Sequence, residues 1–193
     1  MPSASLRRPA RDRILDTAEQ LFYTHGIRAV GVDRVIAEAK VAKATLYTHF
    51  RSKDELVAEC LRRDAARVRA GLAEAARATP PGPARIGVLF DSAAASAAEP
   101  GYQGCGFINA AAEHLPGPVG DIIAMHRADL LAFLTENVDR EAEDERAAVA
   151  RVILSLLDGA KVASMSTGPA AFTDVRPTAL ALATYPLLTI RSE

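Results

Sequence analysis

Apolar residues recur along this chain at the three- and four-residue spacing of an α-helix. The spacing predicts a first helix over residues 11–25, followed by Gly26 where a helix C-cap is expected. Between residues 32 and 50 it predicts two short helices separated only by Lys40 and Val41. Helices joined so closely must cross steeply, which is the geometry of a helix-turn-helix, a motif whose second helix enters the DNA major groove.

The helical pattern continues to the end of the chain. Ser52, with Glu55 three positions later, predicts a capping box at the start of a long helix that ends before the proline-rich run 80–83. Further helices are predicted over residues 84–98, 106–114, 119–140, 144–167 and 177–190. No run of alternating β-branched residues indicates a strand. We therefore expect an all-α fold of about nine helices.

The second helix of the pair carries side chains suited to DNA. Its exposed face and flanks contain Lys40, Lys43, Ala44, Thr45, Tyr47, Thr48, His49 and Lys53. None of these is acidic. Amines, hydroxyls and an imidazole reach phosphate oxygens and base edges, whereas a carboxylate is repelled by the duplex. We predict these residues as the DNA contacts.

Residues 41–50 (VAKATLYTHF) and 52–56 (SKDEL) resemble the signature of the TetR/AcrR family of bacterial transcriptional regulators. The resemblance implies a three-helix DNA-binding domain over residues 9–55 and a helical ligand-binding and dimerisation domain over 56–193. Two positions depart from the family pattern. Lys40 replaces the usual turn glycine, where a left-handed backbone costs about 1 kcal/mol. Ala42 replaces a serine, which removes a helix cap.

What the resemblance implies for function is a homodimeric regulator. We expect a repressor that is released from a palindromic DNA operator by a small apolar effector, with no catalytic residues, cofactor or metal. Effector binding would tilt the helix over residues 52–78 and change the spacing of the two recognition helices. The alternative is a helical enzyme or small-molecule-binding protein with an incidental helix-turn-helix-like pair.

The distribution of charge supports DNA binding. Residues 1–69 hold 14 Lys and Arg against 9 Asp and Glu, so of the totals of 23 and 24 the remainder holds 9 against 15. Only the N-terminal part is basic. Cys60 and Cys105 form no ligand-spaced pair, and neither a signal peptide nor an apolar run of membrane-spanning length is present. These features predict a cytoplasmic protein with no membrane contact.

Polar residues on apolar stretches are candidates for an effector site, because a few polar groups orient a ligand in an apolar cavity. They are Cys105, Asn109, Glu113, His126, Asp158 and Met165. If Glu113 and Asp158 both face inward, they favour a hydroxyl or cationic group on the ligand over a carboxylate. Two alternatives stay open: Glu113, His114 and His126 as metal ligands, and Cys105 as a redox-active thiol.

The helices predicted over residues 144–167 and 177–190 have apolar faces wider than a surface helix needs. The residues concerned are Val149, Val152, Ile153, Leu156, Leu157, Ala160, Ala163, Leu180, Leu182, Ala183, Leu187 and Leu188. The family resemblance implies that these helices form a four-helix dimer interface. The alternative is that both are fully buried within one protomer.

Overall fold

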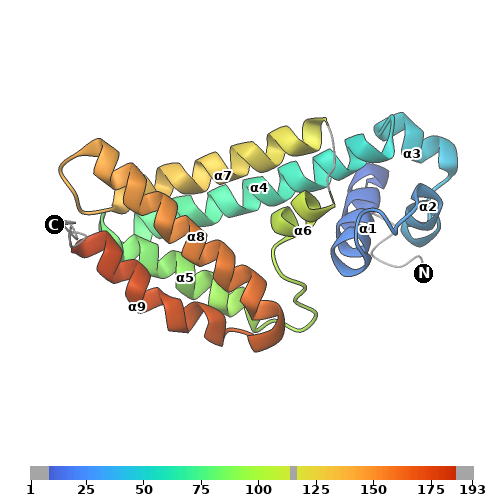
Figure 1. Cartoon of the computed structure of the whole chain (residues 1–193). Coiled ribbons are helices and arrows are strands. Elements are labelled where there is room, and N and C mark those ends of the chain that lie inside the picture. The colour runs from blue at the N-terminus through green and yellow to red at the C-terminus, as the bar shows by residue number, and fades with distance from the viewer. Residues whose placement is uncertain (1–8, 114–116, 186–193) are drawn as a thin grey trace. The chain divides into compact units, whose positions relative to one another are not determined.

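The computed structural model describes residues 9–113 and 117–185 (Figure 1). Within these residues the chain forms nine helices and no strand, which confirms the expected all-α fold. They are α1 (Ala10–His25), α2 (Val32–Ala39), α3 (Lys43–His49), α4 (Lys53–Ala78), α5 (Pro83–Ala97), α6 (Gly106–Ala112), α7 (Pro118–Asn137), α8 (Glu143–Thr167) and α9 (Ala170–Thr184). In this part of the chain, no helix is long and apolar enough to cross a membrane.

The turn between α2 and α3 has the left-handed residue predicted at Lys40, whose φ is 54° and ψ 51°. The Lys40 N–H donates to the Ala37 carbonyl (3.3 Å), and the Val41 N–H donates to the Ile36 carbonyl (3.3 Å). This pair of bonds is a Schellman motif, which satisfies carbonyls left free at a helix C-terminus. The turn therefore forms despite the missing glycine, and α3 can leave α2 at a steep angle.

The start of α4 has the predicted capping box. The Glu55 N–H donates to Ser52 Oγ (3.1 Å), and the Glu55 carboxylate accepts from the Arg51 N–H (2.7 Å). One backbone donor in the first turn of the helix and one ahead of it are thus satisfied by side chains. The cap fixes where α4 begins directly after the helix-turn-helix.

The last described helix begins earlier than the sequence indicated. We expected it to start at Pro177, but α9 starts at Ala170 and contains Pro177 in its interior. The chain reverses instead at Gly168 (φ +64°) and Pro169. Pro177 lacks the N–H that would bond the Thr173 carbonyl, and since both residues are exposed, water can replace that donor. Residues 186–190 of the predicted helix lie outside the described residues.

The chain divides into two compact units that are not consecutive in sequence. Unit 1 comprises Met1–Arg67 and Cys105–Met125, and unit 2 comprises Val68–Gly104 and His126–Glu193. This division differs from the expected boundary between residues 55 and 56. The reason is that α6 and the start of α7 are buried in the same apolar core as α1 to α3, through Phe107, Ala110, Val119 and Ile122. Both α4 and α7 contribute residues to each unit.

Unit 2 is built around the packing of α9 against α5 and α8. These three helices lie side by side (Figure 1). Its core contains Phe90, Leu134, Ile153, Leu157 and Phe172, each at most 1% exposed. At the edge of this packing, Arg176 of α9 lies against Gly87 of α5 and pairs with Asp91 (Nε–Oδ1 2.7 Å).

Candidate DNA-binding surface and effector region

The recognition helix α3 buries one side and exposes the other. Leu46 is 0% exposed and Phe50, directly after the helix, is 1% exposed, so both anchor α3 in the core of unit 1. On the opposite side, Lys43, Ala44, Thr48 and His49 are exposed, Thr45 is half-buried and Tyr47 is 43% exposed. Five of the predicted contacts on α3 are therefore open to a partner, and the sixth, Thr45, is partly so.

The two predicted contacts that flank α3 lie at helix ends. Lys40 is exposed at the C-terminus of α2, where the Arg13 guanidinium of α1 donates to the carbonyls of Ala39 (3.4 Å) and Lys40 (3.5 Å). Lys53 is the first residue of α4 and is half-buried. Ala42 provides no side-chain cap to α3, as the sequence indicated. The N-cap residue of α3 therefore provides no side-chain oxygen to the free N–H groups at the start of this helix.

Asp33, an acidic residue of α2, also belongs to this surface. It was not among the DNA contacts predicted from the sequence. Asp33 Oδ1 lies 3.2 Å from the Lys43 Nζ, and the two side chains are 80% and 64% exposed. Asp33 is in the first turn of α2 and Lys43 is the first residue of α3. The steep crossing of a helix-turn-helix brings these two helix starts together, and that crossing was the signal that could have revealed the pair.

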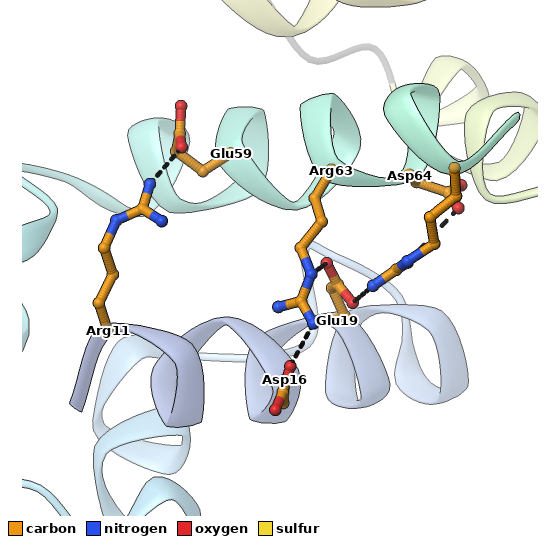
Figure 2. Close-up of polar contacts among 7 residues, drawn as sticks. Arg11, Asp16, Glu19, Glu59, Arg63 and Asp64 are labelled. Atoms are coloured by element: carbon orange, nitrogen blue, oxygen red, sulfur yellow. Dashed lines mark hydrogen bonds and ion pairs between the residues drawn. The ribbon is translucent and has the colours of Figure 1, made fainter. Parts of the chain in front are cut away.

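Charged side chains connect α1 to α4 along their length (Figure 2). Arg11 of α1 pairs with Glu59 of α4 (2.5 Å), and its guanidinium also lies 5.5 Å above the centre of the Phe50 ring. Further along, Arg63 pairs with Asp16 (2.5 Å) and Glu19 (3.5 Å). Glu19 also pairs with Arg67 at 2.6 Å. The ion pairs add to the apolar contacts through which Leu56 and Leu61 of α4 are anchored in the core of unit 1.

Glu113, a predicted effector contact, is instead bound to the backbone of the loop before α2. Its carboxylate accepts from the Ile27 N–H (2.8 Å) and from the Arg28 N–H (2.6 Å). Gly26 has a φ of +84°, and a Cβ there would meet Glu113 Oε1 at 3.4 Å. We call this the Glu113 clasp. It joins the C-terminus of α6 to the segment that leads into the helix-turn-helix.

The six predicted effector residues are divided between the two units. Cys105, Asn109 and Glu113 belong to unit 1, and His126, Asp158 and Met165 to unit 2. Asp158 is paired with Arg127 (2.6 Å) and lies 4.0 Å from Lys161. Met165 is 59% exposed. Because Glu113 and Asp158 both have partners, the expected preference for a hydroxyl or cationic ligand loses its basis.

Polar side chains of α7 and α8 do gather within unit 2. His126 is only 5% exposed, and burial, reinforced by the charge of Lys161, lowers its pKa to about 4. Ser164 is also buried; it bonds the Tyr102 hydroxyl (3.1 Å) and donates to the Lys161 carbonyl (2.9 Å). A buried, neutral imidazole is a group that can orient a ligand through one hydrogen bond.

The metal alternative receives no support from the geometry of the described residues, and the redox alternative at Cys105 stays a prediction. Among the described residues, no three His, Cys, Asp or Glu side chains gather closely enough to hold a metal ion. His114, one of the three candidate ligands, lies outside the described residues. Cys60 is buried, and burial raises the pKa of its thiol, which is the behaviour of a core residue. Cys105 is half-buried at the N-cap of α6.

A helix-turn-helix with an exposed basic and hydroxyl-bearing reading helix, followed by a larger helical part, defines a DNA-binding regulator. Residues 14–60 match the sequence family described as bacterial regulatory proteins, tetR family. The fold is similar to the crystal structure of SCO4454, a TetR-family transcriptional regulator from Streptomyces coelicolor, with a TM-score of 0.83 and 32% identity. That similarity covers 90% of this chain and 93% of the Streptomyces chain. The chain therefore belongs to the TetR family.

Two further similarities extend this result. A TetR transcriptional regulator of Streptomyces avermitilis, described there as putative, has a TM-score of 0.73 and 29% identity, covering 91% of this chain and 96% of that one. The HTH-type transcriptional activator FasR of Mycolicibacterium smegmatis is 36% identical over 69 residues. That match spans 36% of this chain and about a third (32%) of FasR. The similarity to FasR therefore concerns only part of each protein.

Proposed function

We propose that this protein is a homodimeric transcriptional regulator that binds a palindromic operator and releases it when a small, largely apolar effector binds. The observation that carries the proposal is the exposed face of α3, anchored from behind by Leu46 and Phe50. A reading helix held this way presents its side chains to the major groove without reorganising the core. Dimerisation places two such helices one turn of DNA apart, which explains a palindromic operator.

The contacts on α3 have two proposed roles. Lys43, Ala44 and Thr45 are at the start of the helix, which in a helix-turn-helix lies closest to the base edges, so we assign them to sequence reading. Lys40, Tyr47, Thr48, His49 and Lys53 are assigned to the phosphate backbone. Phosphate contacts position the protein but carry little sequence information, so the two groups differ in what their loss changes.

The proposed DNA contacts are tested with the double variant Tyr47→Ala, Lys53→Ala. Its affinity for a duplex selected by the wild-type protein should fall at least about tenfold, equally for all sequences, and its salt dependence should become shallower because a phosphate contact is lost. Arg77→Ala removes one exposed charge near the C-terminus of α4 and should leave affinity unchanged. Unaltered affinity in the double variant would overturn the proposal.

The direction of regulation is proposed as repression. The partial match to FasR, which is named an activator, supports activation as the second candidate. A promoter–reporter assay separates the two when the protein is deleted in the source cell. Higher reporter output after deletion supports a repressor, and lower output supports an activator.

We propose that the effector contacts His126, which is buried, and Asp158, which is half-buried, in unit 2. Cys105 and Asn109 remain candidates from the sequence. The geometry favours neither Glu113, which is held by backbone amides, nor Met165, which is exposed. Since α4 and α7 contribute residues to both units, a shift of either helix on effector binding would move residues of unit 1.

A thermal-shift screen of apolar metabolites tests the effector region. For an active compound, His126→Leu should reduce the shift because the hydrogen bond to the imidazole is lost, while Met165→Leu should leave it unchanged. Release of the selected duplex by the same compound connects binding to function. If His126→Leu lost no affinity for any active compound, the effector region would lie elsewhere.

For the dimer interface we propose the surface of α8 and α9 that the protomer leaves uncovered. Most apolar residues of these helices are used within unit 2, including Val149, Ile153 and Leu157. Val152 and Val162 of α8, at 46% and 56% exposure, are not. They are therefore better test positions than Leu156, which packs against the core of unit 2. Leu187 and Leu188 lie outside the described residues.

The double variant Val152→Glu, Val162→Glu places two charges on that surface. We expect sedimentation to report a folded monomer, because unpaired charges cannot be buried in an apolar interface. Met125→Glu changes a somewhat more exposed apolar residue (59%) on α7 and should leave the dimer intact. A wild-type protein that sediments as a monomer at micromolar concentration would overturn the interface.

A further inference from the structure

The ion pair between Asp33 and Lys43 occupies the surface proposed to face DNA. The two side chains are 80% and 64% exposed, and their charged atoms are 3.2 Å apart. Exposed pairs of this kind contribute little to folding stability. The pair is therefore poorly explained as a device that holds α2 to α3, since Val35, Leu46 and Phe50 already do so from the core.

A carboxylate on a DNA-facing surface needs a partner in the complex. Near phosphates it is repelled, which lowers affinity for every sequence alike. In the major groove, however, Asp accepts from the N4 amino group of cytosine, and Lys donates to O6 and N7 of guanine. A G·C pair presents that donor beside those acceptors on a single edge. Asp33 and Lys43 present the complementary acceptor and donor side by side.

We propose that Asp33 and Lys43 together read one G·C base pair in each operator half-site, Asp33 through the cytosine and Lys43 through the guanine. The inference rests on the proposed DNA binding. An A·T pair also presents an amino group, adenine N6, but it lacks the two neighbouring guanine acceptors O6 and N7 for Lys43, so only G·C satisfies both side chains fully. The pair then acts as a filter: it favours the correct site and weakens binding elsewhere.

The test is selection of bound sequences from a random duplex library, for the full-length wild-type protein, Asp33→Asn, Asp33→Ala and Glu38→Gln. Wild type should select one G·C pair per half-site that Asp33→Ala no longer requires, a loss of discrimination of about tenfold or more. Asp33→Asn should shift the preference there toward adenine, because an amide matches both N6 and N7 of adenine. Both Asp33 variants should also bind random duplexes more tightly.

Glu38→Gln is the matched control. Glu38 is an exposed acid of the same helix and pairs with Arg34 (2.9 Å), not with a residue of α3. It should change binding of random duplexes at most and leave the selected sequence as in wild type. If the Asp33 variants selected the wild-type sequence with no position relaxed, the reading role would be overturned. If wild type enriched no duplex at all, DNA binding itself would fail.

Discussion

Each unit of this protein has its own apolar core, and the two units differ in where their polar and charged contacts lie. In unit 1, α1 and α4 are joined at the surface by the ion pairs of Arg11, Arg63 and Arg67. In unit 2, α5, α8 and α9 are joined by apolar packing around Phe90 and Phe172. The described polar side chains that are fully buried, His126, Asn137 and Ser164, all belong to unit 2. Unit 1 thus adds charged contacts at its surface to an apolar core, whereas unit 2 buries polar side chains beside its apolar core.

The largest expected effect comes from the apolar core of unit 2. Phe172→Ala removes a ring that is 1% exposed between α9 and its neighbours and should cost about 3–5 kcal/mol, because it leaves a cavity. Urea unfolding followed by circular dichroism measures the loss. Arg63→Ala, in the ionic connection of unit 1, should cost far less. Equal losses in the two variants would show that the ion pairs of Arg63 stabilise unit 1 as much as the buried ring of Phe172 stabilises unit 2.

The next effect is a pH dependence of unit 2. The pKa of His126 is lowered to about 4 by burial and by Lys161, with Asp129 and Asp158 opposing and Arg127 adding to the shift. The unfolded chain, with an ordinary His pKa near 6.5, then binds the proton first. His126 therefore contributes fully to the free energy of unfolding above pH 6.5. As pH falls toward 4, this contribution is lost, by about 2–3 kcal/mol.

That loss is measured as the free energy of unfolding at pH 7 and at pH 5. His126→Gln does not titrate, so its stability should change less between the two pH values. Hydrogen exchange should show faster opening of α7 and α8 at pH 5 in the wild type alone. A wild-type pH dependence identical to that of the variant would show that His126 is charged, or free to become charged, in the folded protein.

A smaller effect is expected from the Glu113 clasp of unit 1, in which a carboxylate binds backbone N–H groups. Glu113→Ala removes two hydrogen bonds from a carboxylate to backbone N–H groups and should cost about 1–2 kcal/mol. Exchange of the Ile27 and Arg28 amide hydrogens should accelerate most. Glu113→Gln retains one acceptor oxygen and should fall between wild type and alanine. Unchanged exchange at these two amides in Glu113→Ala would contradict the clasp.

The smallest effect is expected from one ion pair of unit 1. Arg11→Ala should lower stability by at most about 1 kcal/mol, because Arg11 is 45% exposed in its side chain and water screens the pair with Glu59. Raising salt from 0.05 to 0.5 M should reduce the difference between variant and wild type, as ions screen the charges. The cation–π contact with Phe50 is less sensitive to salt and leaves a residual difference.

Features decided by neighbouring residues were predictable from the sequence. The turn at Lys40 and the capping box of Ser52 and Glu55 each depend on a few consecutive positions, and both are present as predicted. The start of α9 was predicted wrongly because proline usually begins a helix, whereas Pro177 is accepted inside one at an exposed position. Rules that use only neighbouring residues thus predicted the helices. They failed for the start of α9, where the exposure of Pro177 decides whether a helix can contain it.

Features that depend on distant residues were not predictable from the sequence. Glu113 was expected to face a ligand because it interrupts an apolar stretch, but its partners Ile27 and Arg28 are 85 or more residues away. Asp33 could not be found from the polar pattern of α3, because it lies on α2. Periodicity shows which face of a helix is polar, but it does not show what that face meets. The same limit explains why α6 was placed outside the DNA-binding unit.

The discontinuity of unit 1 determines when it can be completed during synthesis. The ribosome makes the chain from the N-terminus, so α1, α2 and α3 emerge long before Phe107, Glu113 and Val119, which belong to the same unit. Until residue 125 has left the exit tunnel, the core of unit 1 lacks its last apolar layer and the loop at Ile27 lacks its clasp. The core of unit 1 is therefore complete only after α5 has been made. A fragment that ends at residue 104 would carry the complete helix-turn-helix sequence without the residues that stabilise it.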